Sequence, residues 1–180
     1  ASFCQAVYRL HYMPSMTISC LTPHEEKFQR LALYGGKTDI IADLLELTDA
    51  MLLAGWQILY LDFVSLYPAV MWSMPYPVGI ATIKRKFRDE NGGPLDLGKW
   101  IMGAGEGFAM VDVTVNKSNL YPILPTRGTK VNHTCNDIVG NVYTLVELRA
   151  AVKRGDIVTK IYEAHLYSST TTLWEAYMRT

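Results

Sequence analysis

Asp62 carries the side chain best placed to do chemistry, because it lies between an expected strand and an expected helix. Residues 58–61 form an apolar run that is expected to be a buried strand, whereas Ser65 and Pro68 are typical of a helix start. A carboxylate is a ligand for Mg²⁺, and free N–H groups at a helix start favour phosphate. A magnesium-bound nucleoside triphosphate would satisfy both, although an aspartate at a strand end is also often a solvated turn or capping residue.

The run Asp-Phe-Val-Ser-Leu-Tyr-Pro-Ala, residues 62–69, resembles a known catalytic motif. It is similar to the first palm motif of family B DNA polymerases, Asp-x-x-Ser-Leu-Tyr-Pro-Ser, with Ala69 in place of the final serine. The resemblance implies a DNA-directed DNA polymerase that works through two Mg²⁺ ions.

Neighbouring segments resemble the protein-primed members of that family. Residues 33–39 are similar to the Tyr-x-Gly-Gly linker between exonuclease and polymerase domains, with Leu33 in place of the tyrosine. Residues 74–79 resemble the stretch that follows the catalytic motif, and residues 111–179 resemble the insertion that receives the terminal protein primer. The resemblance covers roughly residues 28–180, and it implies DNA and a terminal protein as partners.

The family's metal and nucleotide contacts transfer onto matching positions of this motif. The resemblance makes Asp62 a catalytic, magnesium-binding carboxylate, and the carbonyl of Phe63 a second metal ligand. It places the amides near Leu66 against the triphosphate. Tyr67 would lie under the deoxyribose, where its ring leaves no room for a 2′-hydroxyl.

The DNA-binding residues implied by the resemblance lie mostly in the linker. Gly35 and Gly36 would let the backbone approach the template strand, with Tyr34 or Lys37 touching it. Ser65 belongs to the same DNA-binding set and is also expected to cap the following helix through its side chain.

Two parts of the family's active site have no counterpart in these residues. The second aspartate motif and the lysine motif of the fingers helix are absent from the sequence. One carboxylate does not hold two metals, so the chain is not expected to polymerise DNA alone. Two hypotheses remain open: a segment of a protein-primed polymerase, or a polymerase-derived, non-catalytic structural subunit of a larger mitochondrial assembly. Mitochondria are the expected location because such polymerases belong to linear mitochondrial plasmids, and viruses are the alternative.

Composition limits the other function classes. The chain has 180 residues with 17 basic and 17 acidic side chains, so its formal net charge is zero, and no basic arm or acidic tail is present. Three cysteines at no ligand-like spacing disfavour a disulfide scaffold or a zinc knuckle. No apolar run reaches the roughly 20 residues of a membrane span.

The expected fold is α+β: a partial palm with an antiparallel sheet and flanking helices, plus a small α+β insertion subdomain. Residues 1–54 would be a linker and helical lead-in after a missing exonuclease domain, 55–110 the first half of the palm, and 111–180 the insertion subdomain. Because an isolated half palm leaves a sheet edge open, the remaining polymerase or other subunits should cover it. The first residue is Ala1, so we expect a processed start or a piece of a longer chain.

Local signals predict the elements that would position these residues. Helices are expected after Thr22, over residues 39–53, from Ser65 toward Met74, between Thr144 and Lys153, and over 170–177. Strands are expected over 58–61, 110–115 and 157–167. Residues 84–99 should form a basic hairpin or loop, whose cations either contact a phosphate backbone or are simply solvated. His11, His24 and His165 show no partner at catalytic spacing and are assigned no role.

Overall fold

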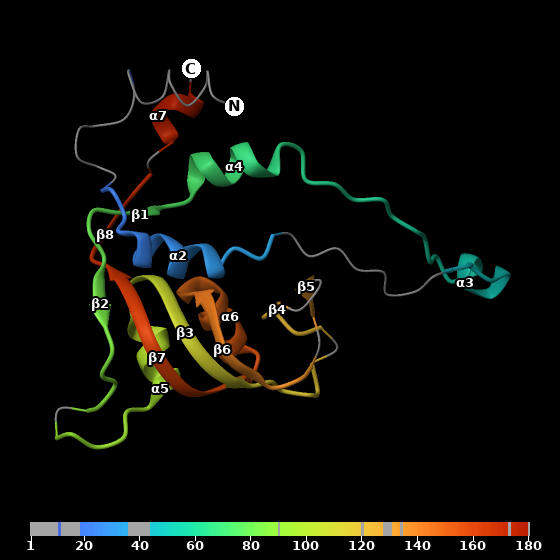
Figure 1. The fold of residues 1–180 in the computed structure, drawn as a ribbon. Coiled ribbons are helices and arrows are strands. Elements are labelled where there is room, and N and C mark those ends of the chain that lie inside the picture. Colours follow the sequence, from blue (N-terminus) through green and yellow to red (C-terminus); the bar gives the residue numbers. More distant parts are fainter. Residues whose placement is uncertain are drawn as a thin grey trace.

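The protein is described from a computed structural model that covers residues 11, 19–35, 44–89, 91–119, 121–127, 131–133, 135–172 and 174–179. It is a mixed α+β protein with antiparallel sheets and flanking helices, as expected (Figure 1). The helices are α2 (Pro23–Leu31), α3 (Asp49–Leu53), α4 (Leu66–Ser73), α5 (Leu97–Gly103), α6 (Leu145–Lys153) and α7 (Glu175–Met178).

The main sheet has four strands in the order β2-β7-β3-β6, and every neighbouring pair is antiparallel. Its strands are β2 (Thr82–Lys84), β3 (Glu106–Thr114), β6 (Ile138–Thr144) and β7 (Ile157–Tyr167). Two small sheets pair β1 (Tyr76–Val78) with β8 (Ser169–Thr171), and β4 (Thr126–Arg127) with β5 (Val131–Asn132). The main sheet therefore takes strands from both sides of residue 110, while the division of the chain at 54 and 110 stays a prediction.

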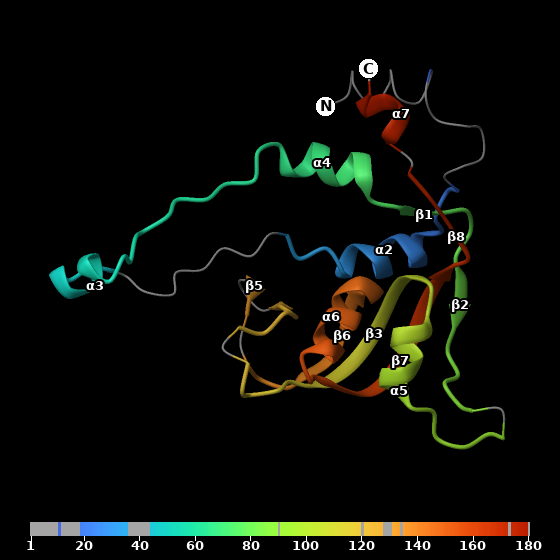
Figure 2. The ribbon, with the colours of Figure 1, turned by 180° about the vertical axis from the view of Figure 1, so that it is seen from behind.

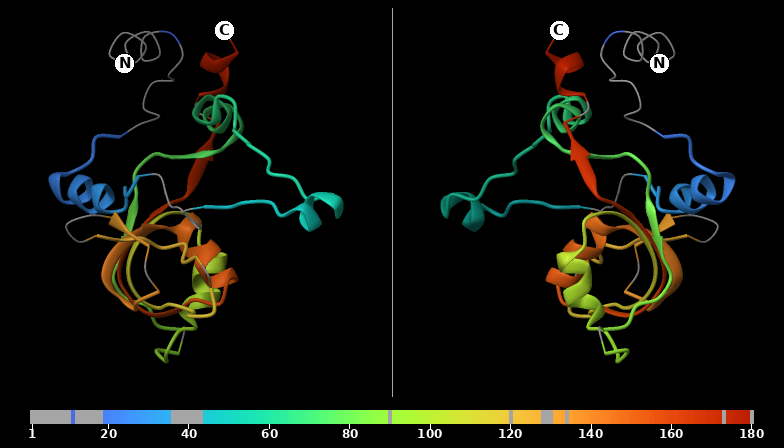
Figure 3. Two further views of the ribbon diagram at one scale, coloured as in Figure 1. Left: turned by 90° about the vertical axis from the view of Figure 1, so that its right-hand side faces the viewer. Right: turned by 90° about the vertical axis from the view of Figure 1, so that its left-hand side faces the viewer.

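Alternation along β3 builds two cores, one on each face of the main sheet. Ala109 and Val111 point to the face that packs on α5 and α6, and both are fully buried. Phe108 and Met110 point to the opposite face, where Phe28 of α2 is buried against them. Figure 3 shows the sheet curved around α5 and α6, with α2 on its outer side.

Several elements form where local signals placed them. α2 and α6 each begin with a Thr-x-x-Glu capping box, in which the Thr22 and Thr144 hydroxyls accept from the backbone N–H three residues on. β7 spans the predicted strand, β3 includes most of the predicted 110–115 strand, and α4 ends before Pro75.

The predicted buried strand at 58–61 is wrong. These residues form no strand, and their side chains are largely exposed, up to 95% for Tyr60. The physical reason is that none of the described strands pairs with this run, so no sheet covers it. Figures 1 and 2 show residues 44–65 reaching away from the main sheet.

Three further expectations need correction. Of the predicted 39–53 helix, residues 39–43 lie outside the described part, and only Asp49–Leu53 are helical, because Thr48 caps a new start there. Of the predicted 170–177 helix, Thr170 and Thr171 instead pair with β1, so α7 is short. Of the hairpin or loop expected at 84–99, Arg88 and Pro94 do form an antiparallel bridge, but the last residues belong to the helix α5, which Asp96 caps.

Candidate functional site

Asp62 lies four residues before α4 in an extended segment, and its side chain is exposed to solvent. Its neighbours are exposed as well, with 79% of Phe63 and 78% of Tyr67 accessible, and Leu66 is partly covered at 45%. The carboxylate and the first turn of α4 are thus adjacent along the chain and open to a ligand. A carboxylate is a ligand type for Mg²⁺ and the first turn of a helix favours phosphate, so the two features that the motif implies lie on one short, exposed segment.

The start of α4 differs from the expected cap. Ser65 occupies the N-cap position, but its backbone is left-handed, with φ 52° and ψ 45°, and its side chain makes no capping hydrogen bond. A side-chain cap needs an extended N-cap residue, so the predicted capping role of Ser65 is wrong. Pro68 still fits, because its missing N–H falls in the first turn, where no helical partner is needed. α4 lies against α7.

Tyr34 of the linker is held by the main sheet. Its ring stacks on that of Tyr143 in β6, with centroids 5.3 Å apart and planes at 19°. The Arg127 guanidinium lies 4.8 Å from the Tyr34 ring centroid and donates to the carbonyl of Leu33 at 2.7 Å. Burial raises the pKa of Tyr34 above its ordinary value of 10.0. The ring is therefore used in packing and fixes the linker to β6.

Gly35 has a backbone that favours glycine, with φ +86° and open space around the position of a Cβ. Other residues rarely adopt this left-handed backbone, so the position favours glycine. Gly36 and Lys37 lie outside the described residues. The linker residues and the Asp62 segment are not brought together, because Tyr34 is fixed to β6 while residues 44–65 reach away from the sheet (Figure 1).

Three of the four cations at residues 84–88 contact other groups of the protein. Lys84 Nζ lies 5.5 Å from the ring centroid of Phe87 and 5.4 Å from that of Trp100. Arg85 pairs with Glu163 at 2.7 Å, and Arg88 donates to the carbonyl of Gly92 at 3.1 Å. These contacts favour the solvated-loop interpretation over a phosphate-binding one.

The oxygen atoms of the Asp62 segment are of the type that binds Mg²⁺, but there are too few of them to hold the ion alone. A carboxylate and the Phe63 carbonyl are hard oxygen ligands of the type Mg²⁺ takes. Among the described residues, the one group of three or more metal-ligating side chains lies elsewhere, and it consists of His24, Glu163 and His165. Asp62 and Phe63 would therefore hold a metal only together with groups from outside this segment.

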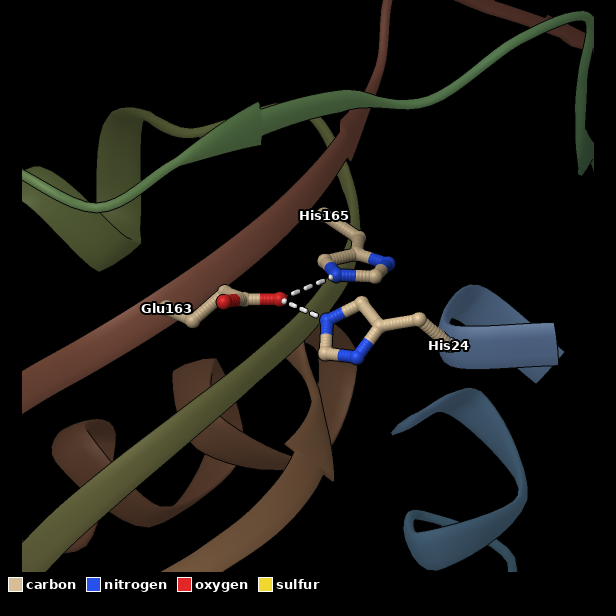
Figure 4. Close-up of side chains that lie close together, drawn as sticks. All are labelled: His24, Glu163 and His165. Carbon is tan, nitrogen blue, oxygen red and sulfur yellow. Dashed lines mark hydrogen bonds and ion pairs between the residues drawn. The ribbon is translucent and has the colours of Figure 1, made fainter. Parts of the chain in front are cut away.

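The cluster of His24, Glu163 and His165 was not predicted from the sequence. Glu163 and His165 sit two residues apart on β7, and His24 reaches them from α2 (Figure 4). Glu163 Oε1 lies 3.0 Å from His24 Nε2 and 2.8 Å from His165 Nε2. The spacing of two within a predicted strand was the available signal, because it puts both side chains on one face. His24 is 139 residues from Glu163 in the sequence, so no local signal pointed to their contact.

Within the described part of the chain, no helix is long and apolar enough to cross a membrane. Curated proteins and solved structures gave no match to the sequence. One protein family does match: the sequence model of DNA polymerase type B, organellar and viral, covers residues 1–180. This match includes the Asp62 motif, the linker and every element described above. The chain therefore belongs to the organellar and viral family of type B DNA polymerases.

Proposed function

We propose that this chain is the segment of a protein-primed DNA-directed DNA polymerase that supplies the first catalytic aspartate, and that it is not active alone. One observation carries the proposal: the exposed Asp62 lies four residues before α4 inside a polymerase-like motif, in a chain of this family. DNA replication in mitochondria, with a virus as the alternative setting, is the proposed context.

Each residue of the segment has a proposed task. Asp62 and the Phe63 carbonyl bind Mg²⁺, which when bound supplies charge stabilisation to the transferred phosphoryl group. The amides near Leu66 orient the triphosphate, and Tyr67 presents its exposed ring to the sugar. Ser65 binds DNA beside them.

The linker has a separate proposed task, which is to hold the template. Gly35 and Gly36 approach the DNA backbone, and Lys37 contacts it. Tyr34 contributes through its anchorage on Tyr143, which fixes the position of Gly35. In this proposal residues 1–54 are the linker and lead-in, 55–110 the first half of the palm, and 111–180 the primer-protein insertion.

The remainder of the polymerase is the proposed partner of the exposed apolar segment. Leu61, Phe63 and Val64 are each more than three-quarters exposed, which is costly for apolar side chains in water. The strands that carry the second aspartate would cover these side chains and remove them from water.

The same exposed surface favours a second candidate function, a non-catalytic structural subunit. A single carboxylate in an apolar segment is also what a polymerase-derived chain would keep after losing its chemistry. In that case the covering partner is another protein of a larger assembly, and DNA and terminal protein are not bound.

The two candidates are separated by primer extension with the whole polymerase that contains this chain. Asp62→Asn should abolish Mg²⁺-dependent nucleotide addition while leaving DNA binding intact, and Asp49→Asn, at the exposed start of α3, is the matched control that should retain activity. Near-normal activity of Asp62→Asn would remove Asp62 from catalysis. Absence of activity in the unaltered polymerase would favour the structural subunit.

A further inference from the structure

We propose that His24, Glu163 and His165 bind one Zn²⁺ ion, which joins α2 to β7. The donor atoms of the three side chains all lie within 4.8 Å of one another. Two imidazoles and one glutamate form a zinc-ligand set that leaves a fourth position for water. The site is independent of the proposed polymerase function, because it is built on α2 and β7 and uses none of the residues 62–67.

The two histidine rings converge on one carboxylate oxygen from different elements. Figure 4 shows the Nε2 atoms of both rings directed at Glu163 Oε1, with the His24 ring entering from α2. The His165 ring is fixed by a stacked contact with Phe28, at a centroid distance of 4.1 Å and an interplanar angle of 10°. Packing therefore sets the orientation of the His165 ring before any metal binds.

The donor spacing is close to that of a zinc site. Ligands about 2.0–2.1 Å from a tetrahedral Zn²⁺ stand roughly 3.3 Å apart. The observed separations are 3.0 Å for His24 to Glu163 and 2.8 Å for His165 to Glu163, as expected of hydrogen-bonded donors. To admit the ion, both of these separations open by a few tenths of an ångström, and the two imidazole nitrogens, which lie within 4.8 Å of each other, move closer together. His24 has room to make this movement because its side chain is 60% exposed.

Arg85 donates a hydrogen bond to one of the two carboxylate oxygens of Glu163. Its Nε lies 2.7 Å from Glu163 Oε2, so one carboxylate oxygen is occupied and Oε1 is left for the metal. Oε1 faces both imidazole nitrogens, so it is the oxygen that would bind the metal.

Loading the site requires one proton shift in each ring. A carboxylate only accepts, so in the empty site each Nε2 carries the hydrogen. When the metal binds Nε2, that proton moves to Nδ1, and neither charge nor atoms are lost. His165 Nδ1 is buried and has no hydrogen-bond partner among the described residues, so it is unpaired whichever nitrogen carries the proton.

The metal preferred by this site differs from that of the polymerase chemistry. Mg²⁺ takes near-octahedral oxygen ligands, whereas imidazole nitrogens suit Zn²⁺. The two sites should therefore bind different ions in the same buffer.

The test is zinc titration of the metal-stripped 180-residue chain in the presence of Mg²⁺, followed by competition with a fluorescent zinc chelator. We expect one Zn²⁺ per chain and a rise in Tm on loading, since zinc binds the folded state. His24→Ala should weaken zinc binding by at least about tenfold and abolish the Tm rise.

The matched control is His11→Ala, since His11 is an exposed histidine outside the cluster, and it should bind zinc like the unaltered chain. Glu163→Gln provides a second ligand variant of unchanged size, and far-UV circular dichroism checks that each variant is folded. No zinc binding by the folded chain, or equal zinc binding by His24→Ala, overturns the proposal. Neither result affects the Asp62→Asn experiment, so the two proposals fail separately.

Discussion

The ring of Tyr34 stacks on the ring of Tyr143 at a centroid distance of 5.3 Å, and this contact joins the linker to the main sheet. Tyr143 is fully buried, and its hydroxyl donates to the carbonyl of Pro125. The pair therefore fixes the position of the neighbouring Gly35, which belongs to the proposed template-binding backbone.

Tyr34→Ala should lower the free energy of unfolding by about 2 kcal/mol, because it removes an aromatic pair and uncovers Tyr143. Tyr34→Phe keeps the ring and should lose less than half as much. Urea unfolding followed by tryptophan fluorescence measures both. Equal losses in the two variants would show that the ring contact is not what holds the linker.

Stability should fall as the pH rises above 10.0, the ordinary tyrosine value. Burial raises the pKa of Tyr143 in the folded chain, so the unfolded chain ionises first and is favoured at high pH. This contribution to stability is complete below pH 10.0 and is lost above it. Tyr143→Phe should reduce the fall of the urea unfolding midpoint with rising alkaline pH. An unchanged fall would show that other tyrosines cause it.

Gly107→Ala should destabilise the sheet by about 2–3 kcal/mol, because an added Cβ would lie 2.0 Å from the carbonyl oxygen of His165. β3 and β7 approach too closely there for any side chain. Gly103→Ala is the matched control, since nothing lies within 4 Å of its Cβ position, and it should change stability by less than about 0.5 kcal/mol. Thermal unfolding that ranks the two variants equally would contradict the close approach.

Ser65→Gly should stabilise the start of α4 relative to Ser65→Ala by about 1 kcal/mol, because only glycine adopts the left-handed backbone without cost. Ser65→Ala should itself have little effect, since the serine side chain makes no capping bond. Hydrogen exchange of the α4 amides is the measurement. Faster exchange in Ser65→Ala than in the unaltered chain would restore the capping role.

Tyr67→Val should make the whole polymerase admit ribonucleotides more readily, because it removes the ring proposed to lie against the sugar. Tyr67→Phe keeps that ring and should discriminate as before. The ratio of deoxyribonucleotide to ribonucleotide incorporation checks this. Unchanged discrimination in Tyr67→Val would assign the exposed ring to packing against the rest of the polymerase.

The sequence by itself determined the elements whose signals are local. The capping boxes at Thr22 and Thr144 were predictable because their hydrogen bonds join residues three apart. The strand over 157–167 was predictable because it is rich in β-branched and aromatic residues, and the polymerase family followed from the motif at residues 62–69.

Only the tertiary structure decided which distant residues meet. The run at 58–61 has the composition of a buried strand, yet it is exposed because a strand is buried only where a partner strand lies beside it. Tyr34 and Tyr143 meet across 109 positions, and His24 and Glu163 across 139, so neither pair leaves a periodic signal. Local hydrogen bonding can be predicted from neighbouring residues, whereas a site assembled from α2 and β7 exists only after the sheet has brought them together.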